Sequence, residues 1–282
     1  MWTADAPATS GLGTQDLFDT RRYGLDDRTS VAYRDLVAHA REELHDDNCV
    51  VLPGFVRPAI LQAMQAEGTE QSGSATYTEK WLNPYFSEPP EDVPESHPLK
   101  RMALRCHGMV RADRFAQDGT IWSLFRNEDL CRFVADCLGY ETLFTYRDPF
   151  GCVNINVQKP GREFSWHFDH NDFTVSMLLH ESEGGGIFEY VPDIRTSENE
   201  NYDAVRAVLD GERQSVRTLA LKPGDLQLFR GGNTLHRVTA PTGSLDRQSL
   251  LLSYVTNPDH IATAAYAERL WGEVHPLHQR SA

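Results

Sequence analysis

The chain has 282 residues, 40 % hydrophobic and 24 % charged, the ordinary balance of a globular protein with a substantial buried core. Its 41 acidic residues outnumber 27 lysines and arginines, and the formal charge of −14 argues against nucleic-acid or anionic-membrane partners. Five cysteines without CxxC spacing, no leader-like N-terminus and no bilayer-length apolar run predict a cytoplasmic protein without a disulfide framework.

The N-terminal part predicts helices that flank a sheet. Residues 1–27 show no sustained hydrophobic period, so we expect either a loose arm or a segment ordered only by packing onto the body. Apolar residues at helical spacing predict an amphipathic helix over 30–47, with Ser30 as its N-cap. A short buried strand over 49–52 then precedes a second helix over 58–67.

Residues 70–100 form a polar, proline-rich section. Four prolines after Phe86 forbid regular structure in that part. The aromatic cluster of Trp81, Tyr85 and Phe86 forms either a lid over an active site or a surface loop folded on its own aromatic side chains. Both interpretations remain open at this point.

Short strands dominate the rest of the chain. A helix over 121–138 comes first, and within the strand region only the helix 203–209 interrupts the pattern. Such spacing between turn signals is typical of an antiparallel jelly roll. We therefore predict a single domain, mostly β with flanking helices, with a double-stranded β-helix (jelly-roll) core over 143–258 and a helix start followed by a tail over 261–279. The expected strands are 143–146, 151–158, 173–179, 186–191, 216–221, 225–229, 234–240 and 248–256.

The sequence KPGREFSWHFDHND at 159–172 carries the central motif. His167 and Asp169 are two residues apart in an extended segment, so their side chains project from the same face. A metal ion needs a third donor, and His236 is the best candidate because it lies in a strand-like piece after a glycine turn. Two histidines and one carboxylate form the facial triad of non-haem Fe(II) oxygenases.

Alternatives exist for each of these positions. The same motif contains His170 and Asp172 at equal spacing, although only the first pair follows a Pro-Gly corner and a short strand directly. His107, His180 and His260 are the other candidates for the distal ligand, but none precedes an arginine-bearing strand at suitable spacing. We therefore prefer the first register and the distal histidine at 236.

An arginine-bearing strand follows His236. Arg247 opens the apolar run RQSLLLSYV, and Ser249 lies on the same strand face. A guanidinium at this place can bind a carboxylate through two parallel hydrogen bonds. Arg237 is a rival, but a residue adjacent to His236 points away from the metal face.

This order of residues resembles the Fe(II)/2-oxoglutarate-dependent dioxygenases, which have a His-x-Asp pair, a distal histidine and an Arg-x-Ser strand. The resemblance implies O2 as a reactant and a specific set of contacts. It places iron at His167, Asp169 and His236, and 2-oxoglutarate at Arg247 and Ser249.

Residues 153–258 also resemble the BesD-like group, which halogenates or hydroxylates free amino acids. Halogenases of this type have a small residue in place of the metal carboxylate, which leaves room for chloride. This chain has Asp169 at that position, so the resemblance favours hydroxylation.

The strand before the motif carries three alternating amides, Asn154, Asn156 and Gln158, which share one face. Either they line the pocket and contact 2-oxoglutarate, or the strand is inside-out and they meet solvent. We favour the pocket, with Asn156 and Gln158 as the contacts.

The BesD-like resemblance implies a polar amino-acid substrate, lysine-like by preference. Such a substrate requires a cationic or backbone donor for its carboxylate and acids for its ammonium groups. The candidate contacts are Arg105, Asp148, His170, Asp172 and, as a covering aromatic, Trp271. The alternatives are an oxygenase acting on another small metabolite or natural-product intermediate, a cupin-type metal-binding isomerase or sensor, and a catalytically silent binding module.

Overall fold

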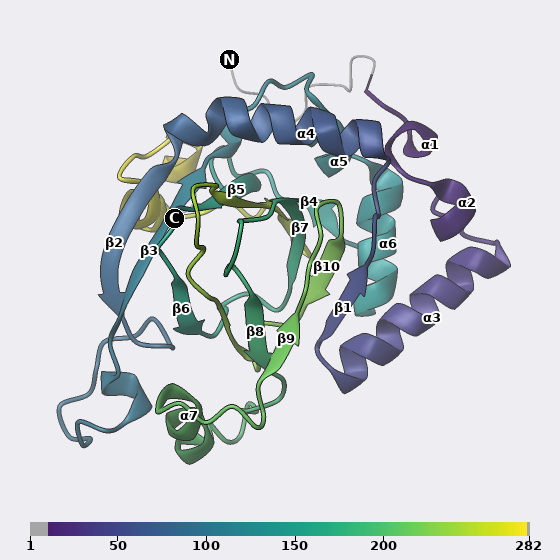
Figure 1. Cartoon of the computed structure of the whole chain (residues 1–282). Helices are drawn as coiled ribbons and strands as arrows, with labels where there is room; N and C mark the ends of the chain where they lie inside the picture. Colours follow the sequence, from purple (N-terminus) through teal and green to yellow (C-terminus); the bar gives the residue numbers. More distant parts are fainter. Residues whose placement is uncertain (1–10, 281–282) are drawn as a thin grey trace.

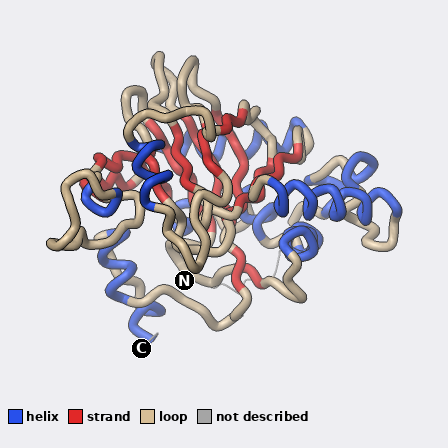
Figure 2. Tube along the Cα trace, turned by 90° about the horizontal axis from the view of Figure 1, so that it is seen from below, coloured by secondary structure: helices blue, strands red, loops and turns tan. Residues whose placement is uncertain are grey.

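The computed structural model describes residues 11–280, in which two antiparallel sheets form a jelly roll (Figure 1). The strands lie together in the middle of the molecule with helices around them (Figure 2). The larger sheet contains, in order across it, β1 (Cys49–Leu52), β10 (Leu226–Phe229), β7 (Thr174–His180), β12 (Arg247–Leu252), β5 (Val153–Gln158), β3 (Ala103–Val110) and β2 (Thr76–Leu82). The smaller sheet contains β6 (Phe164–His167), β11 (Leu235–Val238), β8 (Phe188–Val191) and β9 (Arg217–Leu219), and β4 (Phe144–Thr145) pairs with β13 (Tyr254–Val255). This confirms the predicted fold class.

Helices cover the outer face of the larger sheet, where they form the main hydrophobic core with it (Figure 1). The α-helices are α1 (Thr14–Leu17), α2 (Thr20–Tyr23), α3 (Val31–Asp46), α4 (Pro58–Gln71), α5 (Thr120–Phe125), α6 (Glu128–Leu138), α7 (Tyr202–Leu209) and α8 (Ala264–Trp271). Short 3-10 helices span Ser72–Ser74, Pro98–Lys100, Ala112–Arg114 and Pro276–Arg280. Within the described part of the chain, none of the helices combines the length and apolarity needed to cross a lipid bilayer.

Alternation along the central strands separates an apolar face from a polar one. Ile155 and Val157 of β5 are fully buried in the core that the helices complete. The intervening Asn156 points the other way, and its partner on β12 is Ser249. The inner face of the larger sheet therefore carries polar side chains inside the roll, as expected for a binding pocket rather than an inside-out strand.

The N-terminal segment is ordered by packing, which was one of the two expectations for it. Leu17, Phe18, Tyr23 and Leu25 are all buried in the main core. Residues 1–10 of the expected arm lie outside the described residues.

The structure contains α1, α2 and β2, which the sequence-based predictions lack, and it divides one predicted helix into two. Residues 76–82 form β2 at the edge of the larger sheet, although a strand is not predicted in this polar section. Edge strands are commonly rich in charged residues, and this composition hides the alternation. The helix predicted over 121–138 is two helices, because the Asn127 side chain accepts a hydrogen bond from the Leu130 N–H and begins a new helix. By contrast, the predicted Ser30 cap is confirmed, since its hydroxyl accepts from the Tyr33 N–H.

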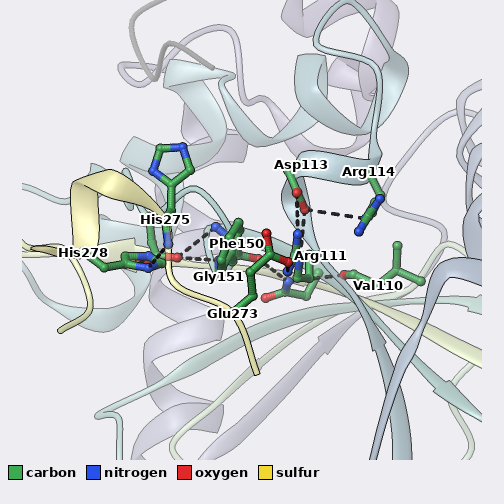
Figure 3. A network of polar contacts seen from close by, with 11 residues as sticks. Val110, Arg111, Asp113, Arg114, Phe150, Gly151, Glu273, His275 and His278 are labelled. Carbon is green, nitrogen blue, oxygen red and sulfur yellow. Dashed lines mark hydrogen bonds and ion pairs between the residues drawn. The ribbon is translucent and has the colours of Figure 1, made fainter. Parts of the chain in front are cut away.

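A buried polar network attaches the C-terminal segment to the roll (Figure 3). His278 Nε2 lies 3.0 Å from Asp148 Oδ2, and the two side chains are 0 % and 1 % exposed. Asp148 also accepts hydrogen bonds from the backbone N–H groups of Phe150, Gly151 and Ala262. One carboxylate thus connects the loop before β5 with the segments on both sides of α8.

Beside this network, Arg111 forms ion pairs with Asp113 and with Glu273, at 2.7 and 2.6 Å (Figure 3). Its guanidinium also lies over the ring of Phe150, 3.8 Å from the centroid. The buried Arg111 therefore adds a second link between the roll and the C-terminal segment.

Candidate active site

His167, Asp169 and His236 converge on one point. His167 ends β6 and is the direct partner of His236 on β11. Asp169 follows in the loop beyond β6, and its Oδ1 lies 3.6 Å from His167 Nε2 and 3.5 Å from His236 Nε2. The potential ligand atoms of the three residues all lie within 4.8 Å of one another. The structure thus brings together the three side chains that the sequence predicts as metal ligands.

Backbone carbonyl groups orient both imidazole rings. His167 Nδ1 lies 2.8 Å from Ser165 O, and His236 Nδ1 lies 3.0 Å from Thr234 O. A ring whose Nδ1–H donates to a carbonyl presents the lone pair of Nε2 to the shared point. Burial, followed by the neighbouring His236, lowers the pKa of His167 well below its ordinary value. The ring is therefore in the neutral form that binds metals.

Asp169 is held in place by its surroundings. The Thr174 hydroxyl donates to Asp169 Oδ2 at 2.9 Å, which leaves Oδ1 facing the imidazoles. Burial alone would raise the pKa of Asp169, but His236, His167 and the Thr174 hydroxyl outweigh it and lower this pKa. One carboxylate with two imidazoles is the donor set of a non-haem Fe(II) site, so these residues fit the metal.

The alternative ligands lie elsewhere. His170 is exposed, with its Nε2 3.2 Å from Tyr85 O. The exposed Asp172 accepts a hydrogen bond from the Tyr140 hydroxyl at 3.3 Å. His180 lies 3.2 Å from Gln65 O, and the ring of His260 stacks on Tyr146.

Arg247 is a buried cation with only neutral partners among the described residues. It is 6 % exposed, and its Nη1 donates to Ser249 Oγ at 2.7 Å and to Gln158 Oε1 at 3.4 Å. Burial lowers the pKa of Arg247 to about 10. The rival Arg237, by contrast, is paired with Glu189 at 2.6 Å. A buried guanidinium without a carboxylate is costly, so this arrangement favours an anionic ligand at Arg247.

Further polar atoms without partners surround this position. Asn156 Oδ1, Gln158 Nε2 and His107 Nδ1 are buried and make no hydrogen bond to the described residues. Gln158 is the strand partner of Arg247, and Asn156 is the partner of Ser249. The sequence analysis considered His107 only as an alternative iron ligand and did not predict its position among these unpaired polar atoms. The signal was its position two residues after Arg105 on one strand face.

Arg105 is a second cation without a hydrogen-bonded or ionic partner among the described residues. Its half-buried guanidinium lies over the rings of Phe86 and Phe164, at 4.8 and 4.5 Å from the centroids. Burial lowers the pKa of Arg105 to about 10, while the charge of Asp169 acts in the opposite direction. Arg105 therefore lies near enough to the His167, Asp169 and His236 cluster for the charge of Asp169 to act on it.

A cavity of about 670 Å³ adjoins the cluster on the side of Asp169. Its size is typical of a small-molecule site, for which volumes of about 300–1,000 Å³ are common. Its polar wall includes two predicted substrate contacts, His170 and Asp172. The other charged or histidine side chains in the wall are His45, Asp193, Arg195 and Arg230.

The remaining predicted contacts lie near the C-terminal segment. Asp148 is saturated by His278 and by backbone N–H groups, so it has no free oxygen for an ammonium group. This corrects its expected role as a substrate contact, which becomes a structural one. Trp271 is 6 % exposed and packs edge-on against Phe150, with the ring centroids 6.5 Å apart.

Comparisons with known proteins agree with this geometry. Residues 99–271 match the model of the Halogenase D family. Among curated protein sequences, none matches the chain at a significant level. A 2OG-Fe(II) oxygenase family oxidoreductase from Burkholderia pseudomallei has a similar structure, with a TM-score of 0.52 and 15 % identity over 79 % of this chain and 92 % of that one.

Two further structures share the fold. The non-heme alpha-ketoglutarate-dependent epimerase SnoN from nogalamycin biosynthesis gives a TM-score of 0.54 and 13 % identity over 79 % of this chain and 83 % of that one. A prolyl hydroxylase from Trichoplax adhaerens gives a TM-score of 0.53 and 13 % identity over 81 % of this chain and 94 % of that one. The chain belongs to the Halogenase D family and is a 2-oxoglutarate-dependent oxygenase, an oxidoreductase that uses Fe(II), 2-oxoglutarate and O2.

Proposed function

We propose that this enzyme hydroxylates an unactivated C–H bond of a small free amino acid, lysine-like or otherwise cationic or polar. His167, Asp169 and His236 hold the iron in this proposal. The observation that carries it is a pair of arginines, Arg247 and Arg105, that have no carboxylate partner among the described residues and accompany this cluster. Two partnerless guanidinium groups match two anionic molecules, the co-substrate and an amino acid.

Arg247 binds the distal carboxylate of 2-oxoglutarate. A diacid brings the negative charge that the neutral partners of Arg247 lack, and a guanidinium binds a carboxylate through two parallel hydrogen bonds. Ser249 and Gln158 fix the position of the guanidinium, because both accept hydrogen bonds from it. Asn156 and His107, whose buried polar atoms lack partners, supply further contacts to the same ligand.

Arg105 binds the carboxylate of the amino acid. Its position between two aromatic rings leaves the edge of the guanidinium, which carries the N–H donors, for a ligand. Asp172 and His170 stand in the cavity wall beside Asp169. An acid at that place complements an ammonium group of a cationic side chain.

The carboxylate of Asp169 favours hydroxylation over halogenation. The halogenases that the chain resembles have a small residue at this position, which leaves room for chloride. Here Thr174 and Gly231 fix a carboxylate in that space, because Thr174 donates to it and the glycine backbone packs against it. Hydroxylation is therefore the reaction that fits this chain.

Fe(II), 2-oxoglutarate and O2 together supply the oxidising power that replaces a C–H hydrogen by hydroxyl, while 2-oxoglutarate gives succinate and carbon dioxide. The protein contributes position and a dry site. Carbonyl groups fix the two imidazoles, Thr174 fixes the carboxylate of Asp169, and Arg105 orients the substrate. The aromatic ring of Phe86 covers His167 at a centroid distance of 5.4 Å.

Two measurements test the proposal. Under anaerobic conditions, the protein with Fe(II) and 2-oxoglutarate should develop a weak visible charge-transfer band, which the Arg247→Met variant lacks. Aerobically, succinate release should respond to lysine-like members of an amino-acid panel, and the product should gain one oxygen atom even when chloride is abundant. A flat spectrum contradicts the proposed iron and co-substrate contacts. A chlorinated product contradicts hydroxylation.

A second candidate is a larger polar metabolite or natural-product intermediate. The cavity of about 670 Å³ favours it, because this volume lies near the middle of the usual range for drug-sized ligands, which are larger than a free amino acid. Stimulation of succinate release by such compounds and by no free amino acid would decide for this candidate.

A further inference from the structure

The turn after β2, residues 83–87, is built around one buried side chain. Asn83 is 1 % exposed, and its Oδ1 accepts hydrogen bonds from the N–H groups of Tyr85 and Ser87, at 3.0 and 3.2 Å. Its Nδ2 donates to Ser87 O at 2.8 Å and to Leu99 O at 2.7 Å. The amide of Asn83 therefore fixes the backbone of the whole turn.

The same turn is attached to the loop that carries Asp169. The Phe168 N–H donates to Pro84 O at 2.8 Å, and His170 Nε2 lies 3.2 Å from Tyr85 O. These contacts involve the residues immediately before and after Asp169. The turn and the loop of the proposed metal ligand thus form one connected structure.

Phe86 stands at the tip of this turn with a left-handed backbone. Its φ is +53°, a region that bulky L residues rarely adopt. Strain of this kind persists only where surrounding contacts determine the conformation, and it is concentrated at functional sites. In this turn, the hydrogen bonds of Asn83 supply those contacts.

The strained backbone directs the Phe86 ring toward the active site. The ring centroid lies 5.4 Å from that of His167 and 5.6 Å from that of His170. The Arg105 guanidinium lies over the same ring at 4.8 Å and over Phe164 at 4.5 Å. Phe86 therefore contacts both the proposed iron ligand and the proposed substrate anchor.

We propose that Phe86 is a positioning residue that determines how the substrate carboxylate is bound. Together with Phe164 it holds the Arg105 guanidinium in one plane, and it shields the cluster from water on this side. Loss of the ring then weakens amino-acid binding and allows 2-oxoglutarate to be consumed without product. This inference rests on the proposed function, because it assigns the substrate carboxylate to Arg105.

The test compares three substitutions of Phe86 with a matched control. Phe86→Gly removes the ring and also the backbone strain, Phe86→Leu keeps apolar volume without the ring, and Phe86→Tyr keeps the ring. The control is Asn201→Gly, because Asn201 has a similar φ of +47° and caps α7. Each protein is assayed for melting temperature, for KM of the amino acid and of 2-oxoglutarate, and for succinate formed per hydroxylated product. Calorimetry on the Zn(II)-loaded protein with 2-oxoglutarate gives amino-acid affinity without turnover.

The glycine and leucine variants should raise the amino-acid KM and the calorimetric Kd by about tenfold, the size expected when a guanidinium loses an aromatic partner. Succinate per product should rise, while the KM for 2-oxoglutarate stays unchanged. Phe86→Tyr should keep the wild-type coupling. Asn201→Gly, which loses a hydrogen bond to Ile194 O, can change the melting temperature but should keep the coupling and the amino-acid affinity of the wild type. A purely structural role would change the melting temperature without affecting coupling.

Unchanged coupling and unchanged amino-acid affinity in folded Phe86→Gly or Phe86→Leu protein would overturn the role of Phe86. Failure of every free amino acid to stimulate the wild type would overturn the proposed function instead. In that case, succinate release without added substrate still tests the shielding role. The rate of this release should rise in the variants that lack the ring. An equal rate in all proteins would refute the shielding role.

Discussion

Gly231 and Asp169 approach so closely that a Cβ on the glycine would lie 2.2 Å from Asp169 Oδ2. The Asp169 N–H also donates to Gly231 O at 3.1 Å, so the contact is made by both backbone and side chain. The absence of a side chain at residue 231 is therefore a condition for the position of the carboxylate.

Gly231→Ala should displace Asp169 and lower the affinity for divalent metal by about 10- to 100-fold, the usual effect of disturbing groups that orient a ligand. Calorimetric titration with Co(II) measures this. Gly232→Ala is the matched control, because the atom nearest its Cβ is Asn171 O at 3.8 Å. Equal affinities for the two variants would contradict the argument.

Arg247→Met should have opposite effects on the free and the ligand-bound protein. Removal of a buried charge without a carboxylate partner should raise the melting temperature of the free protein. The stabilisation that 2-oxoglutarate gives, about 2.7 kcal/mol at a hundredfold excess over Kd, should disappear. Thermal melting with Mn(II), with and without 2-oxoglutarate, measures both effects. Arg237→Met is the control and should keep the response to 2-oxoglutarate, since Arg237 is paired with Glu189.

His107 should make the metal-free protein sensitive to acid. Burial, followed by the charge of Arg105, lowers the pKa of His107 well below its ordinary value in the folded state. Below about pH 6.5 the unfolded chain therefore binds a proton that the folded chain does not, so stability falls as the pH falls. The loss approaches about 1.4 kcal/mol per pH unit for one such histidine.

In His107→Gln, urea unfolding between about pH 6.5 and 5 should show a slope of stability against pH that is shallower by up to this amount. Parallel curves of stability against pH for the variant and the wild type would contradict this role of His107. The variant should also bind 2-oxoglutarate more weakly, because the flexible amide of glutamine does not hold its polar atoms at the position of the His107 Nδ1 atom in the proposed pocket.

Asp148→Ala should destabilise the fold and leave the active site intact. The substitution leaves His278 and three backbone N–H groups without their acceptor in a buried place, which costs about 3 kcal/mol or more. Chemical unfolding measures the loss, and the shift of melting temperature caused by 2-oxoglutarate should stay unchanged. Glu273→Gln is the control. It removes one exposed partner of Arg111, which keeps its pair with Asp113, so the effect should be below about 1 kcal/mol.

Several features were predictable because they depend on neighbours along the chain. The period of apolar residues gives the longer helices and most strands, and the hydroxyl of Ser30 caps the helix that follows it. The spacing between His167 and Asp169 places both on one face, and Ser249 follows Arg247 in the same way. The order of these motifs led to the correct fold class and cofactors.

Other features depend on residues that are distant in sequence, and the sequence by itself does not reveal them. β2 is a strand because β3 pairs with it, and the structural role of Asp148 requires His278, which comes 130 residues later. His107 joins the proposed co-substrate pocket only because the fold places β3 beside β5, which carries Gln158, and β5 beside β12, which carries Arg247. The left-handed backbone of Phe86 requires the hydrogen bonds of Asn83 within a turn that the sequence shows only as polar and proline-rich. Local sequence patterns determined which functional groups this chain can offer. Long-range pairing and burial decided which of these groups lie around one site. The physical reason is that the energy of a buried polar group depends on the partners that the fold brings to it.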